Sequence, residues 1–285
     1  MNIYYLMFVS AMLLYGTNGT VAHFITLNSY EIVLCRAALG GLFLFLVLLV
    51  KRQPFVFKGL EKSWAFLAAS SVTMGFGWLF LFEAFAQIGA SLAILLNYLG
   101  PIFVMMAAPI LFHEHITRVK ILGLASVVIG MVLVNGADVQ AHGVSWGLFC
   151  GLMSGITYGS NLILAKKAVG IPGMQNAACQ LAGAFVIIAI FTAIFHTGTI
   201  QLDGTNIAAI LVLGVVNSGL ACCFCFTSMQ HLPAQSISIC SYIEPLSALA
   251  FAALFLGEVL TPIQWAGAAF ILGGIMGAEL WERKS

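Results

Sequence analysis

Residues 241–245 read SYIEP and residues 97–101 read NYLGP, and each stretch lies in the middle of a long apolar run. The two look like copies of one another, except that Glu244 in one corresponds to Gly100 in the other. A carboxylate at the centre of a bilayer costs roughly 2.5 to 3.5 kcal/mol on insertion scales, so such residues usually face a bundle interior or a wet cavity. The stretches therefore predict a helical membrane protein organised around a site at Glu244.

The composition indicates the solvent in which this chain folds. Hydrophobic residues make up 61% of the sequence and charged residues 7%, with a mean hydropathy of +1.06. So few charges do not cover an ordinary water-facing surface. The charges cluster between apolar runs of about 20 residues, the length that a helix needs to cross a bilayer, and short alternating strands of a barrel are not seen. We predict an all-α polytopic membrane protein.

The apolar runs predict ten transmembrane helices joined by short loops. No soluble domain, basic nucleic-acid patch or P-loop remains, so we expect no nucleic-acid partner, no cofactor and no direct drive by ATP. The sequence predicts the lipid bilayer as the environment of the chain. It does not distinguish a monomer from a homodimer. The expected spans are 4–25, 30–50, 64–84, 90–111, 116–135, 144–165, 173–196, 206–229, 234–256 and 261–281.

The basic residues predict the orientation, because cytoplasmic loops of membrane proteins carry an excess of Lys and Arg. With both termini cytoplasmic, ten of the eleven Lys and Arg residues fall on the cytoplasmic side. Only Arg36 does not. We expect a multi-pass protein of the cell (inner) membrane with both termini in the cytoplasm. The ten residues are Lys51, Arg52, Lys58, Lys62, Arg118, Lys120, Lys166, Lys167, Arg283 and Lys284.

An internal repeat relates the two halves of the chain. A shift of 144 positions pairs identical residues without a gap, among them Tyr98 with Tyr242 and Pro101 with Pro245. A shift of 143 pairs residues 15–18, YGTN, with residues 158–161, YGSN. We predict two five-helix repeats, residues 1–136 and 144–285. Since five is odd, the repeats must enter the membrane from opposite sides, and inverted repeats of this kind place a site between them near the midplane.

The ends of the two fourth helices also resemble a known family. Residues 100–117 and 244–261, with Gly-Pro or Glu-Pro at the start and Glu-x-x-Thr at the end, are similar to the twice-repeated signature of the EamA-type branch of the drug/metabolite transporter superfamily. The first copy departs from the family pattern, because His113 stands in place of Gly. The resemblance implies a ten-helix carrier with a central cavity that moves metabolites such as amino acids, commonly outward.

Pro101 and Pro245 are expected to bend the fourth helices. Each proline lacks an N–H, so the carbonyls of Asn97 and Ser241 lose their helical bonds. Matched bends suit gating helices, although packing bends repaired by neighbouring helices remain the alternative.

Two charged residues are candidates for substrate contact. Glu244 would bind a substrate ammonium or carry a proton; its alternative is a neutral, hydrogen-bonded structural acid. Arg36 would receive a carboxylate by bidentate pairing, unless it reaches the outer interface or pairs with Glu31 or another structural acid. Glu83 is expected at the interface, with a proton site as the lesser alternative. Glu114 is expected to cap the helix that follows it, together with Thr117; Glu258 and Thr261 would do the same at the end of the second repeat.

Matched polar and aromatic residues are predicted to line an aromatic cavity that orients a small ligand. Lone aromatics in membrane helices usually serve packing, so the symmetric pairs carry this prediction. The candidates besides Arg36 and Glu244 are Tyr15, Asn18, Trp78, Tyr98, Tyr158, Asn161 and Tyr242.

Other conspicuous features have structural explanations. Gly147, Gly151, Gly155 and Gly159 recur every fourth residue, which predicts a groove for a close helix neighbour. The His-Glu-His run at 113–115 lacks the spacing of a metal site, and the seven cysteines lie in apolar runs as small buried hydrophobes, so we expect no metal.

The sequence therefore predicts a secondary transporter, not an enzyme, that exports small metabolites such as amino acids by alternating access. A lipid or lipid-linked sugar flippase of the same fold is the main alternative. An intramembrane enzyme would need a catalytic partner for Glu244, and the sequence offers no obvious one.

Overall fold

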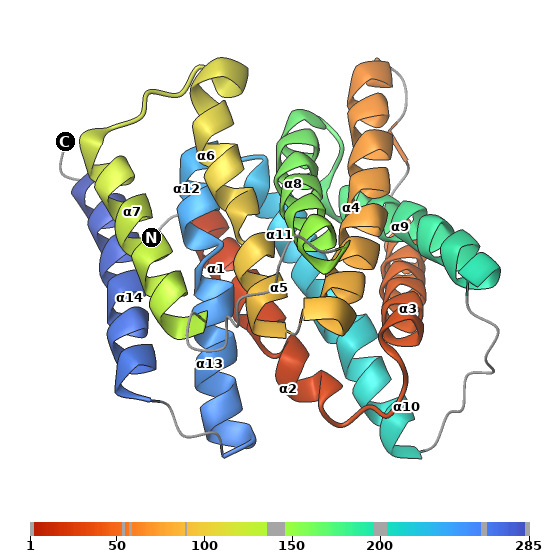
Figure 1. The fold of residues 1–285 in the computed structure, drawn as a ribbon. Coiled ribbons are helices and arrows are strands. Elements are labelled where there is room, and N and C mark those ends of the chain that lie inside the picture. The colour runs from red at the N-terminus through yellow and green to blue at the C-terminus, as the bar shows by residue number, and fades with distance from the viewer. Residues whose placement is uncertain are drawn as a thin grey trace.

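The computed structural model describes residues 3–52, 55–56, 59–88, 90–135, 146–195, 204–257 and 261–282, and all regular structure within these ranges is helical (Figure 1). The elements are α1 (Ile3–Gly16), α2 (Asn18–Ala22), α3 (Ser29–Val50), α4 (Glu61–Ile88), α5 (Ala90–Asn97), α6 (Leu99–Phe112), α7 (Arg118–Asn135), α8 (Trp146–Lys167), α9 (Gly173–Phe195), α10 (Gly204–Leu211), the π-helical segment η2 (Val212–Leu220), α11 (Ala221–Met229), α12 (Ala234–Cys240), α13 (Ile243–Phe255) and α14 (Pro262–Glu282).

Seven helical segments in these ranges are long and apolar enough to cross a membrane, which confirms the all-helical membrane architecture. The count of ten spans stays a prediction. The segments are Tyr30–Val50, Glu61–Phe85, Ala93–Phe112, Trp146–Lys167, Gly173–Ile194, Asn206–Met229 and Ala234–Phe255, and Pro262–Ala278 is a shorter apolar helix. The predicted boundary between the repeats, near residues 136–144, lies outside the described residues. The same holds for Glu258 and for the basic residues Lys58, Arg283 and Lys284.

Three long helices are interrupted inside the bundle. α5 gives way to α6 at Tyr98, and α12 gives way to α13 at Ser241 and Tyr242. Both interruptions come a few residues before a proline that cannot donate to the preceding turn. The backbone angles at the two tyrosines are nearly the same, φ −75°, ψ 4° at Tyr98 and φ −73°, ψ −3° at Tyr242. α1 and α2 are likewise separated at Thr17, close to the site described below.

Glycines allow the closest helix contacts. α7 and α14 lie side by side at one edge of the bundle (Figure 1). A Cβ on Gly123 would come within 2.8 Å of the Gly274 carbonyl oxygen, so neither position has room for a side chain. The glycine groove predicted on α8 is confirmed, because Gly155 lies against the carbonyl oxygen of Leu96 and Gly159 against that of Gly100.

The remaining contacts connect early and late parts of the chain. α8 packs against α4, α5 and α6, while α1 packs against α11 and α13. α3 packs against both α9 and η2, and α4 packs against α9. The largest apolar cluster contains Phe8, Leu44, Leu181 and Met229, which come from α1, α3, α9 and α11. The breaks at Tyr98 and Tyr242 are therefore held inside a bundle that mixes helices from both ends of the chain.

Candidate functional site

Glu244 stands in the first turn of α13, directly after the interruption of the α12–α13 pair. Its carboxyl group interacts with the Tyr98 hydroxyl and with the Arg36 guanidinium. The hydroxyls of Tyr15 and Tyr158 also feel its charge. The charge of Glu244 thus acts on residues of α1, α3, α8 and the α5–α6 break, which are far apart in the sequence.

Arg36, in the third turn of α3, is the positive counterpart of Glu244. Its Nε donates a hydrogen bond to Ser218 Oγ at 2.9 Å, and its guanidinium carbon lies 4.7 Å from the centre of the Trp78 ring. Contact with an aromatic face stabilises a desolvated cation by electrostatic attraction. Both Arg36 and Glu244 are described residues, and the structure shows no direct ion pair between them. Their opposite charges share one cluster without neutralising each other by contact.

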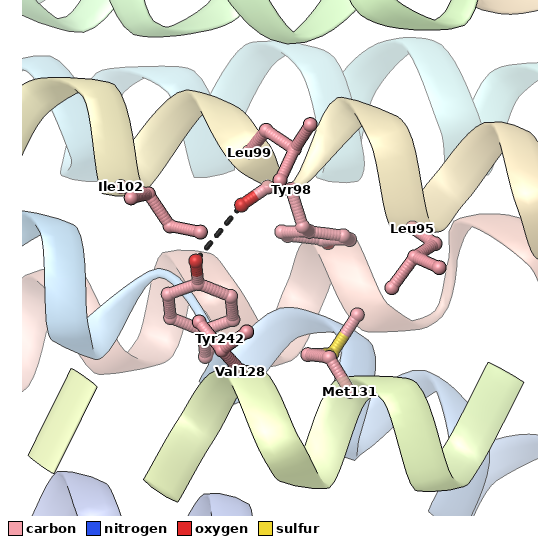
Figure 2. Close-up of a pocket in the computed structure, with 7 residues that line it drawn as sticks. All are labelled: Leu95, Tyr98, Leu99, Ile102, Val128, Met131 and Tyr242. Carbon is pink, nitrogen blue, oxygen red and sulfur yellow. Dashed lines mark hydrogen bonds between the residues drawn. The ribbon is translucent and has the colours of Figure 1, made fainter. Parts of the chain in front are cut away.

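Tyrosines surround the two charges. The Tyr98 ring packs edge to face on Tyr158 at 6.5 Å between centroids and tilted on Tyr242 at 5.8 Å. The Tyr242 hydroxyl donates to the Tyr98 carbonyl at 2.8 Å, which ties the two helix breaks together (Figure 2). The Tyr15 hydroxyl donates to Cys222 Sγ at 3.1 Å. Four of the predicted tyrosines therefore lie in or beside the cluster.

The cluster residues are not fully buried. Tyr15, Arg36, Trp78, Tyr158 and Glu244 each keep part of their surface accessible.

A small pocket beside the cluster has a different character (Figure 2). Its volume of about 20 Å³ suits a single water molecule. It lies between the α5–α6 break and α7, and none of its lining residues is charged. We therefore do not regard it as the substrate site. The lining residues are Leu95, Tyr98, Leu99, Ile102, Val128, Met131 and Tyr242.

The structure places Asn18 and Asn161 in two separate hydrogen-bond networks. Asn18 Oδ1 accepts from Asn217 Nδ2 at 2.9 Å, at the α1–α2 interruption. Asn161 Nδ2 donates to Gln180 Oε1 at 2.8 Å and to Ser70 Oγ at 2.9 Å. These amides hold helices together, and in the described part of the chain neither forms a hydrogen bond with Glu244.

Several cluster residues escaped the sequence analysis. Ser218 and Cys222 contact Arg36 and Tyr15, respectively, yet a single serine or cysteine in an apolar run carries no distinctive signal. The 144-residue shift offered a clue, because it places Cys222 opposite Trp78 and Gln180 opposite Arg36. Positions that match across the repeat but differ in chemistry are where the two halves would diverge in function.

The prediction that Glu114 caps the helix following it is wrong. Its carboxylate does not cap α7, which follows it, but accepts from the backbone N–H groups of Ala234 at 2.7 Å and Gln235 at 3.2 Å, at the start of α12. Thr117 alone caps α7, accepting from the Lys120 N–H at 3.3 Å. The left-handed backbone at His113, with φ 55°, ends α6 just before Glu114. Glu83 accepts a hydrogen bond from the Tyr30 hydroxyl at 2.5 Å, away from Glu244.

A bundle of membrane-length helices, with interrupted segments near Arg36 and Glu244, defines a polytopic membrane protein. Comparison with known proteins gives the family. The EamA-like transporter family matches residues 2–136 and again residues 145–279. The chain belongs to the EamA-like transporter family.

Individual relatives agree with this assignment. The chain is 22% identical over 275 residues to YxxF, an uncharacterized transporter of Bacillus subtilis (strain 168), covering 94% of this chain and 86% of that protein. It is 25% identical over 222 residues to the "Probable amino-acid metabolite efflux pump" of Salmonella typhimurium, covering 73% of this chain and 74% of the other. One solved crystal structure has the same fold, with a TM-score of 0.86, 16% identity and 98% coverage of both chains.

Proposed function

We propose that this protein is a secondary transporter of small zwitterionic metabolites, with amino acids as the preferred substrates. The observation that carries the proposal is the placement of Arg36 and Glu244 in one cluster without a direct ion pair. An amino acid carries a carboxylate and an ammonium, and it would satisfy both protein charges at once. Charge-assisted hydrogen bonds of this kind are about twice as strong as neutral ones.

The surrounding aromatic rings support the same substrate class. Trp78, Tyr98 and Tyr158 offer apolar faces beside the charged groups, and such a mixture of apolar walls with a few polar groups is typical of small-molecule sites. A bulky or aromatic side chain would pack on these faces while the charged end pairs with Arg36 and Glu244. The Salmonella relative named as an amino-acid metabolite efflux pump adds support for amino acids and for export.

Alternating access between two inverted five-helix repeats, with ten spans in all, is the mechanism we propose. The matched backbone angles at Tyr98 and Tyr242, 144 positions apart, support it. The helix contacts support it too: exchanging the halves converts the α4–α8 contact into the α11–α1 contact, and the α6–α8 contact into the α13–α1 contact. Rocking of one repeat against the other would expose the central cluster to each side in turn.

Contacts at one end of the bundle would have to break during this motion. Glu114 caps α12, and Lys166 Nζ donates to the Leu232 carbonyl just before α12. Ser63 Oγ joins the start of α4 to the Val169 carbonyl at the same end. Lysines and arginines flank these contacts, so we place this end, and both termini, in the cytoplasm. The structure would then represent a state closed toward the cytoplasm.

Counterflow in reconstituted vesicles tests the proposal. Purified protein is reconstituted into liposomes loaded with one unlabelled amino acid at a time, and entry of the same labelled amino acid is followed. We expect at least one bulky amino acid to be exchanged faster than in protein-free vesicles. The same vesicles, carrying a fluorescent phospholipid, test the flippase alternative. Lipid movement without exchange of any amino acid would overturn the proposal.

A further inference from the structure

We propose that the π-helical segment η2 positions the substrate site, with Ser218 aiming Arg36 at a substrate carboxylate and Asn217 fixing the break in α1. This inference rests on the proposed function, because it concerns the same cluster. The inference adds a chemical requirement to the proposed function: the substrate must carry a carboxylate or an equivalent planar anion.

Ser218 holds the guanidinium of Arg36 from one side. The Ser218 side chain is fully buried, and its Oγ accepts from Arg36 Nε. The Trp78 ring covers one face of the guanidinium. Within the described residues, no protein group is recorded as accepting from the two terminal Nη groups. A guanidinium held by its Nε and by one face presents its Nη edge, which pairs with a carboxylate through two parallel hydrogen bonds.

Asn217 holds α1 where that helix is interrupted. Its Nδ2 lies 2.9 Å from the Leu14 carbonyl oxygen, 2.8 Å from Thr17 Oγ1 and 2.9 Å from Asn18 Oδ1. The Asn217 side chain is 1% exposed, and its Oδ1 has no hydrogen-bond partner among the residues that the structure describes. An amide with two hydrogens and three acceptors in reach is confined to this position. Tyr15, which donates to Cys222, lies in the sequence between the bonded residues Leu14 and Thr17.

The π-helical segment carries two consecutive residues that bond to different helices. Asn217 reaches α1 and Ser218 reaches α3, although they are consecutive in the chain. π-helical turns inside α-helices are frequently found at functional sites. The corresponding segment of the first half, 144 positions earlier, lies within the uninterrupted α-helix α4 and carries Thr73 and Met74 at these two positions. The device is therefore present in one half only, the half that also carries Glu244.

Ligand analogues can separate a positioning role from a merely structural one. The amino acid that most stabilises the wild-type protein in a thermal-shift panel is compared with its carboxamide, which keeps the ammonium and the side chain. The ratio of the two Kd values measures the preference for a carboxylate. We expect Ser218→Ala to lower this ratio about tenfold. The variant lacks the hydrogen bond that orients the guanidinium, and the free energy of one such bond corresponds to roughly this change in affinity.

Controls make the outcome decisive. Ser218→Thr keeps the hydroxyl and should restore the ratio, and Ser126→Ala removes a serine hydroxyl that bonds the Phe270 carbonyl outside the cluster and should not change it. If Ser218→Ala does not fold, Ser218→Cys is read in the same way. An equal loss of affinity for the amino acid and for its carboxamide would assign Ser218 a structural role and overturn the inference. Failure of the wild-type protein to bind or exchange any amino acid would instead overturn the proposed function.

Discussion

Replacing Glu244 by glutamine removes one charge from the centre of the cluster and changes almost nothing else. Gln has the same shape, and its amide can still meet the Tyr98 hydroxyl that Glu244 contacts. What disappears is the charge-assisted hydrogen bond to a substrate ammonium, which is worth about 1.5 to 3 kcal/mol. Glu244 is only half-buried, and the nearby Arg36 opposes a bound cation, so we expect the lower part of that range. This corresponds to roughly 10- to 30-fold weaker binding of an amino acid.

The assay compares each amino acid with its N-acetyl derivative, which has no ammonium. Counterflow and thermal-shift affinities are measured for the wild-type protein and for Glu244→Gln. We expect the variant to lose affinity for the free amino acid and to change little toward the acetylated one. Glu83→Gln is the matched control, because Glu83 is also a carboxyl group in a membrane helix but is bonded to Tyr30 away from the cluster.

Two results would refute this reasoning. Unchanged affinity of Glu244→Gln for the free amino acid would show that the carboxylate does not contact the ammonium. A loss of the same size for the acetylated compound would show that Glu244 acts through the structure of the site. A lower melting temperature without ligand, relative to Glu83→Gln, would point the same way, toward a structural acid.

Three further changes probe the frame around the site. Gly100→Ala should destabilise the protein by about 1 to 3 kcal/mol, because the new Cβ would lie 2.7 Å from the Gly155 carbonyl oxygen; its melting temperature, compared with Gly19→Ala in open space, checks this. Glu114→Gln should weaken the cap on α12 and open the end of the bundle that we propose to face the cytoplasm, so a cysteine placed there should react faster with a membrane-impermeant thiol reagent. Tyr242→Phe should lose about 0.5 to 1.5 kcal/mol of stability with its bond to Tyr98, measured by thermal unfolding.

Each of these expectations has a contradicting outcome. Equal melting temperatures for the two glycine variants would mean that α6 and α8 can separate without loss. A Glu114→Gln protein with unchanged labelling would show that the cap does not limit opening. If Tyr242→Phe were as stable as the wild type, the hydrogen bond between the two helix breaks would not hold them together.

Sequence patterns located the helices and their interruptions because those features depend on local chemistry. Apolar runs of sufficient length indicated the membrane spans, and the missing N–H of Pro101 and Pro245 indicated where the helices are interrupted. The 144-residue correspondence was likewise visible as identical residues at a fixed spacing. Within the candidate site, the selection of Tyr15, Arg36, Trp78, Tyr98, Tyr158 and Glu244 as binding residues stays a prediction.

Partnerships between distant residues were out of reach of the sequence. Arg36 and Ser218 are 182 positions apart, and only the packing of α3 against η2 brings them into contact. Glu114 was assigned to the helix next in sequence, whereas the fold brings the start of α12 closer. Hydrogen bonds form with whichever group is nearest in space, and nearness in space is a property of the whole bundle.

The sequence by itself determined that the chain spans a membrane, where two of its helices break, and that a carboxyl group stands at one of these two breaks. Only the tertiary structure shows why the carboxyl group of Glu244 has no counterpart in the other half. Gly100 is pressed against the backbone of Gly155 and Gly159 and has no room for a side chain, while Glu244 at the matching position points into a cluster with Arg36 and the tyrosines. Helix proximity, which no single residue encodes, makes the two matched positions chemically different.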